Sequence, residues 1–269
     1  MSINRRDFLR IAGFGAVLGL SGASVAATVK KEIEASGPFK PDPKGLTAKR
    51  WGMAIDMSKL KSDAEIQKCV DACHQVHNVP EVDPDHPQQE IKWIWPESYE
   101  HAFPGNEGEF MSPHFKHMPF LVLCNHCENP PCVRVCPTKA TFKRKTDGIV
   151  MMDMHRCIGC RFCMAACPYG ARSFNFRDPR PFIKKDLNLE FPTRTKGVVE
   201  KCTFCYERLA KGVQPACAEV SNGAIVFGDL EDSNSEVRKV IDTNFTIRRK
   251  PELGTQPSVY YVIGGKDHD

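Results

Sequence analysis

Cysteine spacing is the feature that most constrains this chain, because eight of its thirteen cysteines lie between residues 124 and 167. They form two runs: Cys124, Cys127, Cys132 and Cys136, then Cys157, Cys160, Cys163 and Cys167. The second run has the spacing C-x2-C-x2-C-x3-C-P, which bacterial proteins use to bind cubane iron–sulfur clusters. The first run has two extra residues before its third cysteine. The alternative metal is zinc, whose paired C-x2-C knuckles stand further apart. These compact runs therefore predict [4Fe–4S] clusters.

The same spacing predicts which cysteines share a cluster. Three closely spaced thiolates bind one cluster, and the fourth cysteine of a run ligates the neighbouring one. We therefore expect cluster A to be held by Cys124, Cys127, Cys132 and Cys167. Cluster B is then expected to be held by Cys157, Cys160, Cys163 and Cys136.

Two further segments read as a degenerate copy of this arrangement. Cys202, Cys205 and Cys217 form a motif whose expected fourth cysteine is replaced by Ser221. Residues 56–60 align with residues 153–157 through an Asp-Met-x-basic pattern, which puts Leu60 in place of a first cysteine. Cys69 and Cys73 repeat the spacing of Cys163 and Cys167. The exchange rule gives cluster C to Cys202, Cys205, Cys217 and Cys73.

A fourth cluster would retain only Cys69, so the sequence predicts three [4Fe–4S] clusters on twelve ligands. Cys69 is then expected to be a buried, inert apolar filler with no thiol near it. A redox or metal role for Cys69 is the alternative.

The repeats predict an α+β fold of two fused ferredoxin-like two-cluster units, rich in loops and small antiparallel hairpins. Residues 121–178 form the complete unit, and residues 51–80 and 197–228 form the split, degenerate one. Residues 81–120 are read as an insertion and residues 229–269 as a C-terminal extension.

Local patterns predict several elements. A hairpin is expected over residues 141–152, strands over 91–95, 171–176, 224–228 and 257–263, and a helix over 233–242 capped by Ser233. The insertion holds histidines at positions 86, 101, 114 and 117. Their spacing supports no haem or zinc site, so we expect them on the surface or in loops. For the aromatic residues of the insertion, a partner-docking surface is an open alternative.

Residues 1–27 have the pattern of an export signal. A twin-arginine signature at residues 4–10 precedes a short apolar segment and a small-residue cleavage site at residues 24–26. We expect export by the twin-arginine route to the periplasm or the outer face of the cytoplasmic membrane, because that route carries folded proteins with their cofactors inserted. An uncleaved membrane anchor is the alternative, although the apolar segment is too short to span a bilayer. Residues 28–50 are expected to be a linker.

Charge and hydropathy exclude other classes of function. The formal net charge is +4, and it falls to about +2 without the charged residues of the signal, which is too little to favour nucleic acid. No later stretch has about 18 consecutive apolar residues, so contact with a membrane is expected only through partners. The sequence also lacks a nucleotide-binding loop and a nucleophile–base pair. It therefore predicts an electron carrier with no catalytic site of its own.

With these motifs, the chain resembles the electron-transfer subunits of membrane-bound respiratory oxidoreductases, which usually hold four clusters. The motifs C-N-H-C-E-N-P-P-C-V-R-V-C-P and C-T-F-C-Y-E-R carry the resemblance, which covers nearly all residues past 45. Within that group, C-H-Q-V-H-N-V-P, I-K-W-I-W and P-E-L-G-T-Q-P-S-V-Y-Y resemble the DsrO family. That family supplies the periplasmic iron–sulfur subunit of the sulfite-reduction-associated membrane complex.

The resemblance implies a role in dissimilatory sulfur metabolism and two partners, an NrfD-type integral membrane quinone-handling subunit and a multihaem cytochrome c. Two alternatives stay open. One is the iron–sulfur subunit of a molybdopterin oxidoreductase or of a formate-dependent nitrite reductase system. The other is an assembly module whose cysteines bind zinc.

Overall fold

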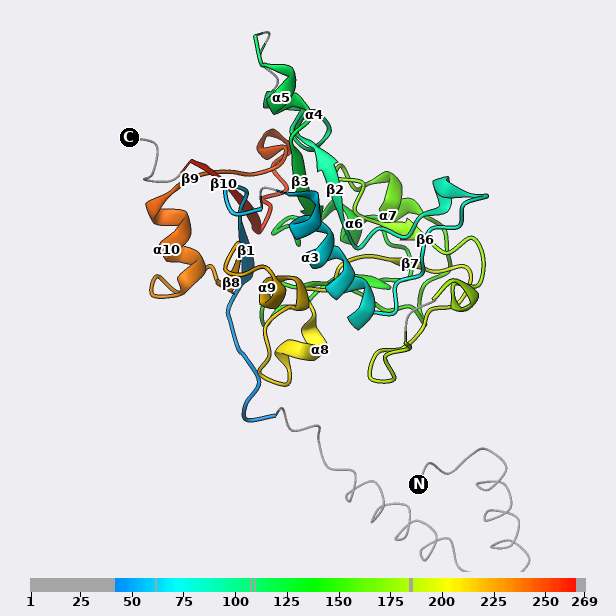
Figure 1. The fold of residues 1–269 in the computed structure, drawn as a ribbon. Coiled ribbons are helices and arrows are strands. Elements are labelled where there is room, and N and C mark those ends of the chain that lie inside the picture. The colour runs from blue at the N-terminus through cyan, green and yellow to red at the C-terminus, as the bar shows by residue number, and fades with distance from the viewer. Residues whose placement is uncertain (1–41, 61, 107, 109, 184–185, 265–269) are drawn as a thin grey trace, which may run out of the picture. The chain divides into compact units, whose positions relative to one another are not determined.

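The computed structural model describes residues 42–60, 62–106, 108, 110–183 and 186–264 (Figure 1). The predicted export signal and most of the predicted linker lie outside these ranges. The described residues from Lys44 onward form a single unit that contains short helices and short strands. None of the helices in the described ranges has the length and apolar composition needed to cross a bilayer.

A four-stranded sheet with the order β8-β1-β10-β9 joins distant parts of the chain. It consists of β1 (Trp51–Asp56), β8 (Ile225–Asp229), β9 (Phe245–Ile247) and β10 (Val259–Gly264). β1 runs antiparallel to β8 and parallel to β10, so the sheet is mixed. The expectation of antiparallel hairpins alone was therefore incomplete. The sequence did not reveal β1, because a strand buried on both faces shows no alternation of apolar and polar residues.

Three two-stranded antiparallel sheets complete the β structure. They pair β2 (Ile94–Ser98) with β3 (Pro119–Leu123), β4 (Thr141–Lys143) with β5 (Val150–Met152), and β6 (Ser173–Phe174) with β7 (Val199–Glu200). The β4–β5 pair confirms the predicted hairpin. The strand predicted over residues 91–95 begins only at Ile94, and the strand predicted over residues 171–176 is shortened to β6.

The longest helix, α3 (Asp63–Val76), begins at a capping box in which Ser62 and Glu65 bond to each other's backbone amides. Its buried face carries Cys69 and Cys73 and packs against α9 (Ala216–Val220). The short helices are α4 (Tyr99–Ala102), α5 (Pro113–Lys116), α6 (Pro131–Arg134), α7 (Phe162–Ala165) and α8 (Tyr206–Leu209). Single 3-10 turns occur at η1 (Pro87–Gln89), η2 (Pro104–Asn106), η3 (Arg180–Phe182) and η4 (Pro251–Leu253).

The predicted C-terminal helix is present as α10 (Glu236–Thr243), but its cap differs from the prediction. The Ser235 hydroxyl, not that of Ser233, accepts the amide hydrogen of Arg238. The same hydroxyl donates to the carbonyl of Asp229 and so ties the helix to β8. Val237 is fully buried in a cluster with Ala54 of β1 and Leu230.

Candidate metal centres

The three C-x2-C loops share one backbone conformation. In each, the residue two positions after the first cysteine is left-handed: His126 (φ 40°), Gly159 (φ 70°) and Phe204 (φ 55°). Histidine and phenylalanine rarely adopt such angles, so the shared conformation is a constraint that the fold maintains. The degenerate segment differs, because Ser62, two residues after Leu60, is extended (φ −120°) and caps α3. That segment lacks both the first thiol and the loop.

Three of the four positions assigned to a fourth cysteine also share a turn. At Cys136, Cys167 and Ser221, the amide donates to the carbonyl three residues earlier, and the carbonyl accepts from the amide three residues later. Ser221 therefore occupies the same backbone position as the two cysteines. Its hydroxyl donates to the Ala218 carbonyl at 2.8 Å and accepts from the Ile225 amide at 2.9 Å, so backbone groups satisfy it.

The cysteine thiols gather into neighbourhoods, and all thirteen are free of disulfides. Burial raises the pKa of Cys127 to about 12, and the nearby thiols of Cys124, Cys132 and Cys167 act in the same direction. Burial likewise raises the pKa of Cys73 far above its usual value, reinforced by the thiols of Cys205, Cys202 and Cys217. These two neighbourhoods contain the residues predicted for clusters A and C.

The third neighbourhood is less complete. Burial raises the pKa of Cys163, and the thiols of Cys132 and Cys157 add to this. Cys136 behaves differently, because hydrogen bonds outweigh burial and lower its pKa. Its sulfur accepts the amide hydrogen of Thr141 at 3.4 Å. For cluster B, then, the thiols of Cys157 and Cys163 interact.

The buried cation Arg172 lies beside these thiols and indicates whether the site suits an anionic cluster. Arg172 is only 5% exposed, and its Nη1 donates to Thr141 Oγ1 at 3.1 Å. Its buried Nη2 has no hydrogen-bond partner within the described part of the chain. Burial lowers the pKa of Arg172, but the thiols of Cys132, Cys163 and Cys124, together with a hydrogen bond to Cys132, raise it above its usual value. A buried guanidinium with an unsatisfied N–H group costs folding free energy unless negative charge lies beside it. Thiolate-bound clusters would supply that charge, so the residues fit the group.

Lys201 is a second buried cation, 1% exposed, directly before Cys202 in the sequence. Its Nζ donates to the carbonyls of Val150 and Cys202, the latter at 2.7 Å. Burial raises the pKa of Cys202 to about 12, and the charge of Lys201 opposes that rise. A thiolate at Cys202 would therefore have a fixed positive neighbour.

His126 joins the first cysteine run to the motif of Cys202, Cys205 and Cys217. Its Nε2 lies 3.1 Å from the Cys202 carbonyl, and its Nδ1 lies 3.1 Å from the Val150 amide. A carbonyl only accepts and an amide only donates, so Nε2 carries the hydrogen. Burial and the charge of Lys201 lower the pKa of His126 far below its usual value, which keeps the ring neutral. The ring stacks on Phe204 with centroids 3.7 Å apart. Spacing rules gave no signal for this role.

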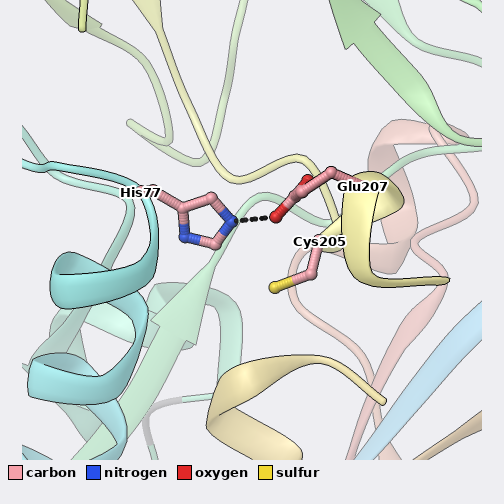
Figure 2. A group of neighbouring side chains, drawn as sticks. All are labelled: His77, Cys205 and Glu207. Atoms are coloured by element: carbon pink, nitrogen blue, oxygen red, sulfur yellow. Dashed lines mark hydrogen bonds and ion pairs between the residues drawn. The ribbon is translucent and has the colours of Figure 1, made fainter. Parts of the chain in front are cut away.

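His77 is the second functional candidate that the sequence did not reveal (Figure 2). It is buried at the end of α3, with Nδ1 2.8 Å from the Cys73 carbonyl and 3.5 Å from Cys73 Sγ. Nε2 lies 2.9 Å from Glu207 Oε1. Ligand atoms of His77, Glu207 and Cys205 all lie within 4.8 Å of one another. Such a set fits a single metal ion, but Cys205 also belongs to the thiol neighbourhood of Cys73. The imidazole and the carboxylate therefore border that neighbourhood.

A cavity remains where the fourth cluster would have been, and none of the described residues that line it is a cysteine. The cavity, of about 260 Å³, is lined by residues that include Leu60, Lys68 and Ser221. Cys69 is fully buried, as predicted, and burial raises its pKa to about 11. The expectation that no thiol lies near it was wrong, because its charge would interact with that of Cys217 across the α3–α9 contact.

The histidines of the predicted insertion do not converge. The side chains of His86, His101 and His117 are 46%, 70% and 71% exposed, and each lies beside a carboxylate. The side chain of His114 lies outside the described part of the structure. The surface placement predicted for the other three is confirmed.

Comparison with known proteins agrees with this chemistry. The family described as "4Fe-4S dicluster domain" matches residues 116–179. The Hdr-like menaquinol oxidoreductase iron-sulfur subunit 1 of Archaeoglobus fulgidus is 41% identical over 98% of this chain and 100% of its own length. The iron-sulfur cluster-binding subunit of menaquinone reductase from Nitratidesulfovibrio vulgaris is 35% identical over 79% and 88%. The NrfC homolog of Haemophilus influenzae is 34% identical over 96% and 94%. The chain therefore belongs to the family of iron–sulfur electron-transfer subunits of menaquinol and other respiratory reductase complexes.

Proposed function

We propose that this chain carries electrons through three [4Fe–4S] clusters in an exported, membrane-associated respiratory complex. The observation that carries the proposal is the thiol neighbourhood of Cys73, Cys202, Cys205 and Cys217. It draws on residues from two segments far apart in the sequence, and the second segment ends in a turn where Ser221 replaces the fourth cysteine. When bound, each cubane would supply one reversibly transferred electron. The chain holds each cluster, excludes water from it and tunes its potential through nearby charges and hydrogen bonds.

Thiols that interact between neighbourhoods support an order for the proposed relay. Cys202 of the cluster C set interacts with Cys124 of the cluster A set. Cys163 of the cluster B set interacts with Cys132 of the cluster A set. Cluster A is thus the middle of a path C–A–B. A buried cation lies near each neighbouring cluster: Lys201 lies on the side of cluster C, and Arg172 lies on the side of cluster B.

The two fused ferredoxin-like units are part of the same proposal. The pairing of β1 with β8 and the contact of α3 with α9 support a unit split between residues 51–80 and 197–228. Residues 121–178 would form the complete unit, which agrees in extent with the dicluster match. The degenerate unit would hold cluster C alone.

Metal content is the direct test of the proposed function. Purified protein is expected to contain about twelve irons per chain and an equal amount of acid-labile sulfide, because three cubanes hold four irons each. Electron paramagnetic resonance of the reduced protein should show interacting spins from neighbouring clusters. About sixteen irons would contradict the loss of the fourth site. Zinc in place of iron would overturn the function itself.

We further propose a DsrO-type role at the outer face of the cytoplasmic membrane, with an NrfD-type quinone-handling subunit and a multihaem cytochrome c as partners. The membrane partner is supported by the likeness to a menaquinol oxidoreductase subunit and to an NrfC homolog. The likeness to an NrfC homolog also favours a second candidate, a formate-dependent nitrite reductase system. Purification of the tagged chain from native membranes tests the first role, and nitrite-reducing activity in the copurified complex would favour the second. A multihaem cytochrome c and a polytopic subunit are expected, and a molybdenum-containing large subunit would contradict the first role.

A further inference from the structure

Exposed apolar side chains surround the residues predicted to hold cluster B. Val135, Ile158 and Phe162 are 38%, 66% and 59% exposed. Each is adjacent in sequence to a predicted ligand of that cluster: Cys136, Cys157 and Cys163 respectively. Of the four ligands, only Cys163 is buried, whereas the cluster C ligands are all buried. Cluster B would therefore lie nearest the surface, beneath an apolar covering.

These side chains come from two segments that the fold brings together. Helices α6 and α7, which lie within the first and second cysteine runs, contact each other (Figure 1). The Asp153 amide donates to the Ala140 carbonyl at 2.7 Å, which holds the segment after Cys136 against the segment before Cys157. We call the surface formed by Val135, Ile158 and Phe162 the cluster B face.

The loop that presents this face is tightly held. Gly159 is left-handed (φ 70°), and a Cβ added there would lie only 2.5 Å from the Gly197 carbonyl oxygen. The Arg161 guanidinium lies 5.5 Å from the ring centre of Phe174 and 5.7 Å from that of Phe176. Ile158 and Phe162 are thus exposed by a well-packed loop, and exposed apolar clusters of this kind mark interaction sites.

The charged side chains around the face are mostly basic. Arg134, Lys139 and Arg161 are exposed, and none has an ion-pair partner among the residues that the structure describes. The nearby carboxylate of Asp153 is already paired with Arg156 at 3.3 Å. An apolar centre with an unneutralised basic rim is complementary to an apolar centre with an acidic rim.

We propose that the cluster B face docks a redox subunit whose contact surface has an apolar centre ringed by Asp and Glu carboxylates. This inference rests on the proposed function, since cluster B is the end of the relay that lies nearest this surface. One electron crosses the contact in each event. Cluster B is oxidised by one electron as the haem, flavin or iron–sulfur centre of the partner is reduced, or the reverse, and no bond is made or broken.

The test is site-specific photo-crosslinking of the holoprotein in its native membranes. Phe162→p-benzoylphenylalanine places the probe in the face, and Phe245→p-benzoylphenylalanine is the matched control. Phe245 is 70% exposed and lies on β9, away from α7 (Figure 1). We expect an adduct at position 162 with one redox subunit, at a peptide rich in carboxylates, and at least about tenfold less of that adduct at position 245.

Charge reversal tests the rim. Arg134→Glu/Lys139→Glu should lower the crosslink yield at position 162 by about tenfold, because like charges then face each other across the contact. Lys49→Glu/Lys239→Glu makes the same change in net charge on the side of the four-stranded sheet and should change the yield by less than about twofold.

The docking proposal would be overturned by adducts only with lipid or with a second copy of this chain, or by no adduct. It would also be overturned by a partner without a redox centre or by a crosslinked peptide without carboxylates. Equal yields at positions 162 and 245 would contradict it as well. Iron content and cluster spectra are measured on the same samples. If the clusters are present and the adduct is missing, docking alone fails. If the clusters are missing from the unsubstituted protein, the proposed function fails.

Discussion

Cys73→Ala should remove cluster C and leave clusters A and B in place. Iron is expected to fall from about twelve to about eight per chain, because a cubane with one missing thiolate at a buried site is not retained. The spectrum of the reduced protein should lose the component that arises from coupling between clusters C and A. Iron analysis and electron paramagnetic resonance together measure both effects.

Cys69→Ala is the matched control for that variant. Cys69 lies on the same buried face of α3, four residues before Cys73, and both side chains are nearly inaccessible to solvent. Each substitution removes one sulfur from the core at a similar cost in folding free energy of about 1–2 kcal/mol. Cys69→Ala should keep about twelve irons. Retention of all three clusters by Cys73→Ala, or loss of a cluster from Cys69→Ala, would contradict the ligand assignment.

Arg172→Met should lower the reduction potentials of clusters A and B by on the order of 100 mV, with a smaller effect on cluster C. A buried unit charge a few ångströms away contributes a few kcal/mol at an effective dielectric constant near 20, and about 2.3 kcal/mol corresponds to 100 mV. Removing the cation disfavours the added electron, so the potential falls. Redox titrations followed by electron paramagnetic resonance report each cluster separately.

Two further variants separate charge from packing. Arg172→Lys keeps a positive charge in the same place and should shift the potentials much less than Arg172→Met. Arg156→Met removes a cation next to Cys157. The Arg156 side chain is 65% exposed, so solvent screening should limit the shift in potential to roughly 20 mV. Equal shifts of all three clusters, or no shift in Arg172→Met, would contradict the role assigned to the buried guanidinium.

Cysteine spacing carried most of the information about the site, because thiolates that share a cluster must lie close together. It predicted that Cys73 belongs with Cys202, Cys205 and Cys217, although these residues lie far from it in sequence. The structure puts the four thiols in one neighbourhood. Their role as ligands stays a prediction. The hairpin of β4 and β5 was predictable too, because a turn signal lies between two short segments that contain β-branched residues.

Tertiary context decided what spacing did not show. β1 is apolar at nearly every position, so its strand character became evident only through its two neighbours in the sheet. His77, His126 and Arg172 were invisible as functional candidates, because their importance comes from burial and from partners many residues away. Single polar residues have no periodicity, and one sequence offers no signal that distinguishes them from surface histidines or arginines.

The position of β1 has a consequence for how the protein is made. This strand leaves the ribosome early, yet both of its partners, β8 and β10, follow more than 160 residues later in the chain. Residues 124–167 can reach their local contacts during synthesis, whereas Cys73 meets Cys202 and Cys217 only after nearly all of the chain has emerged. Contacts between such distant segments form late. Clusters A and B should therefore be assembled first, and cluster C should complete maturation as the sheet closes.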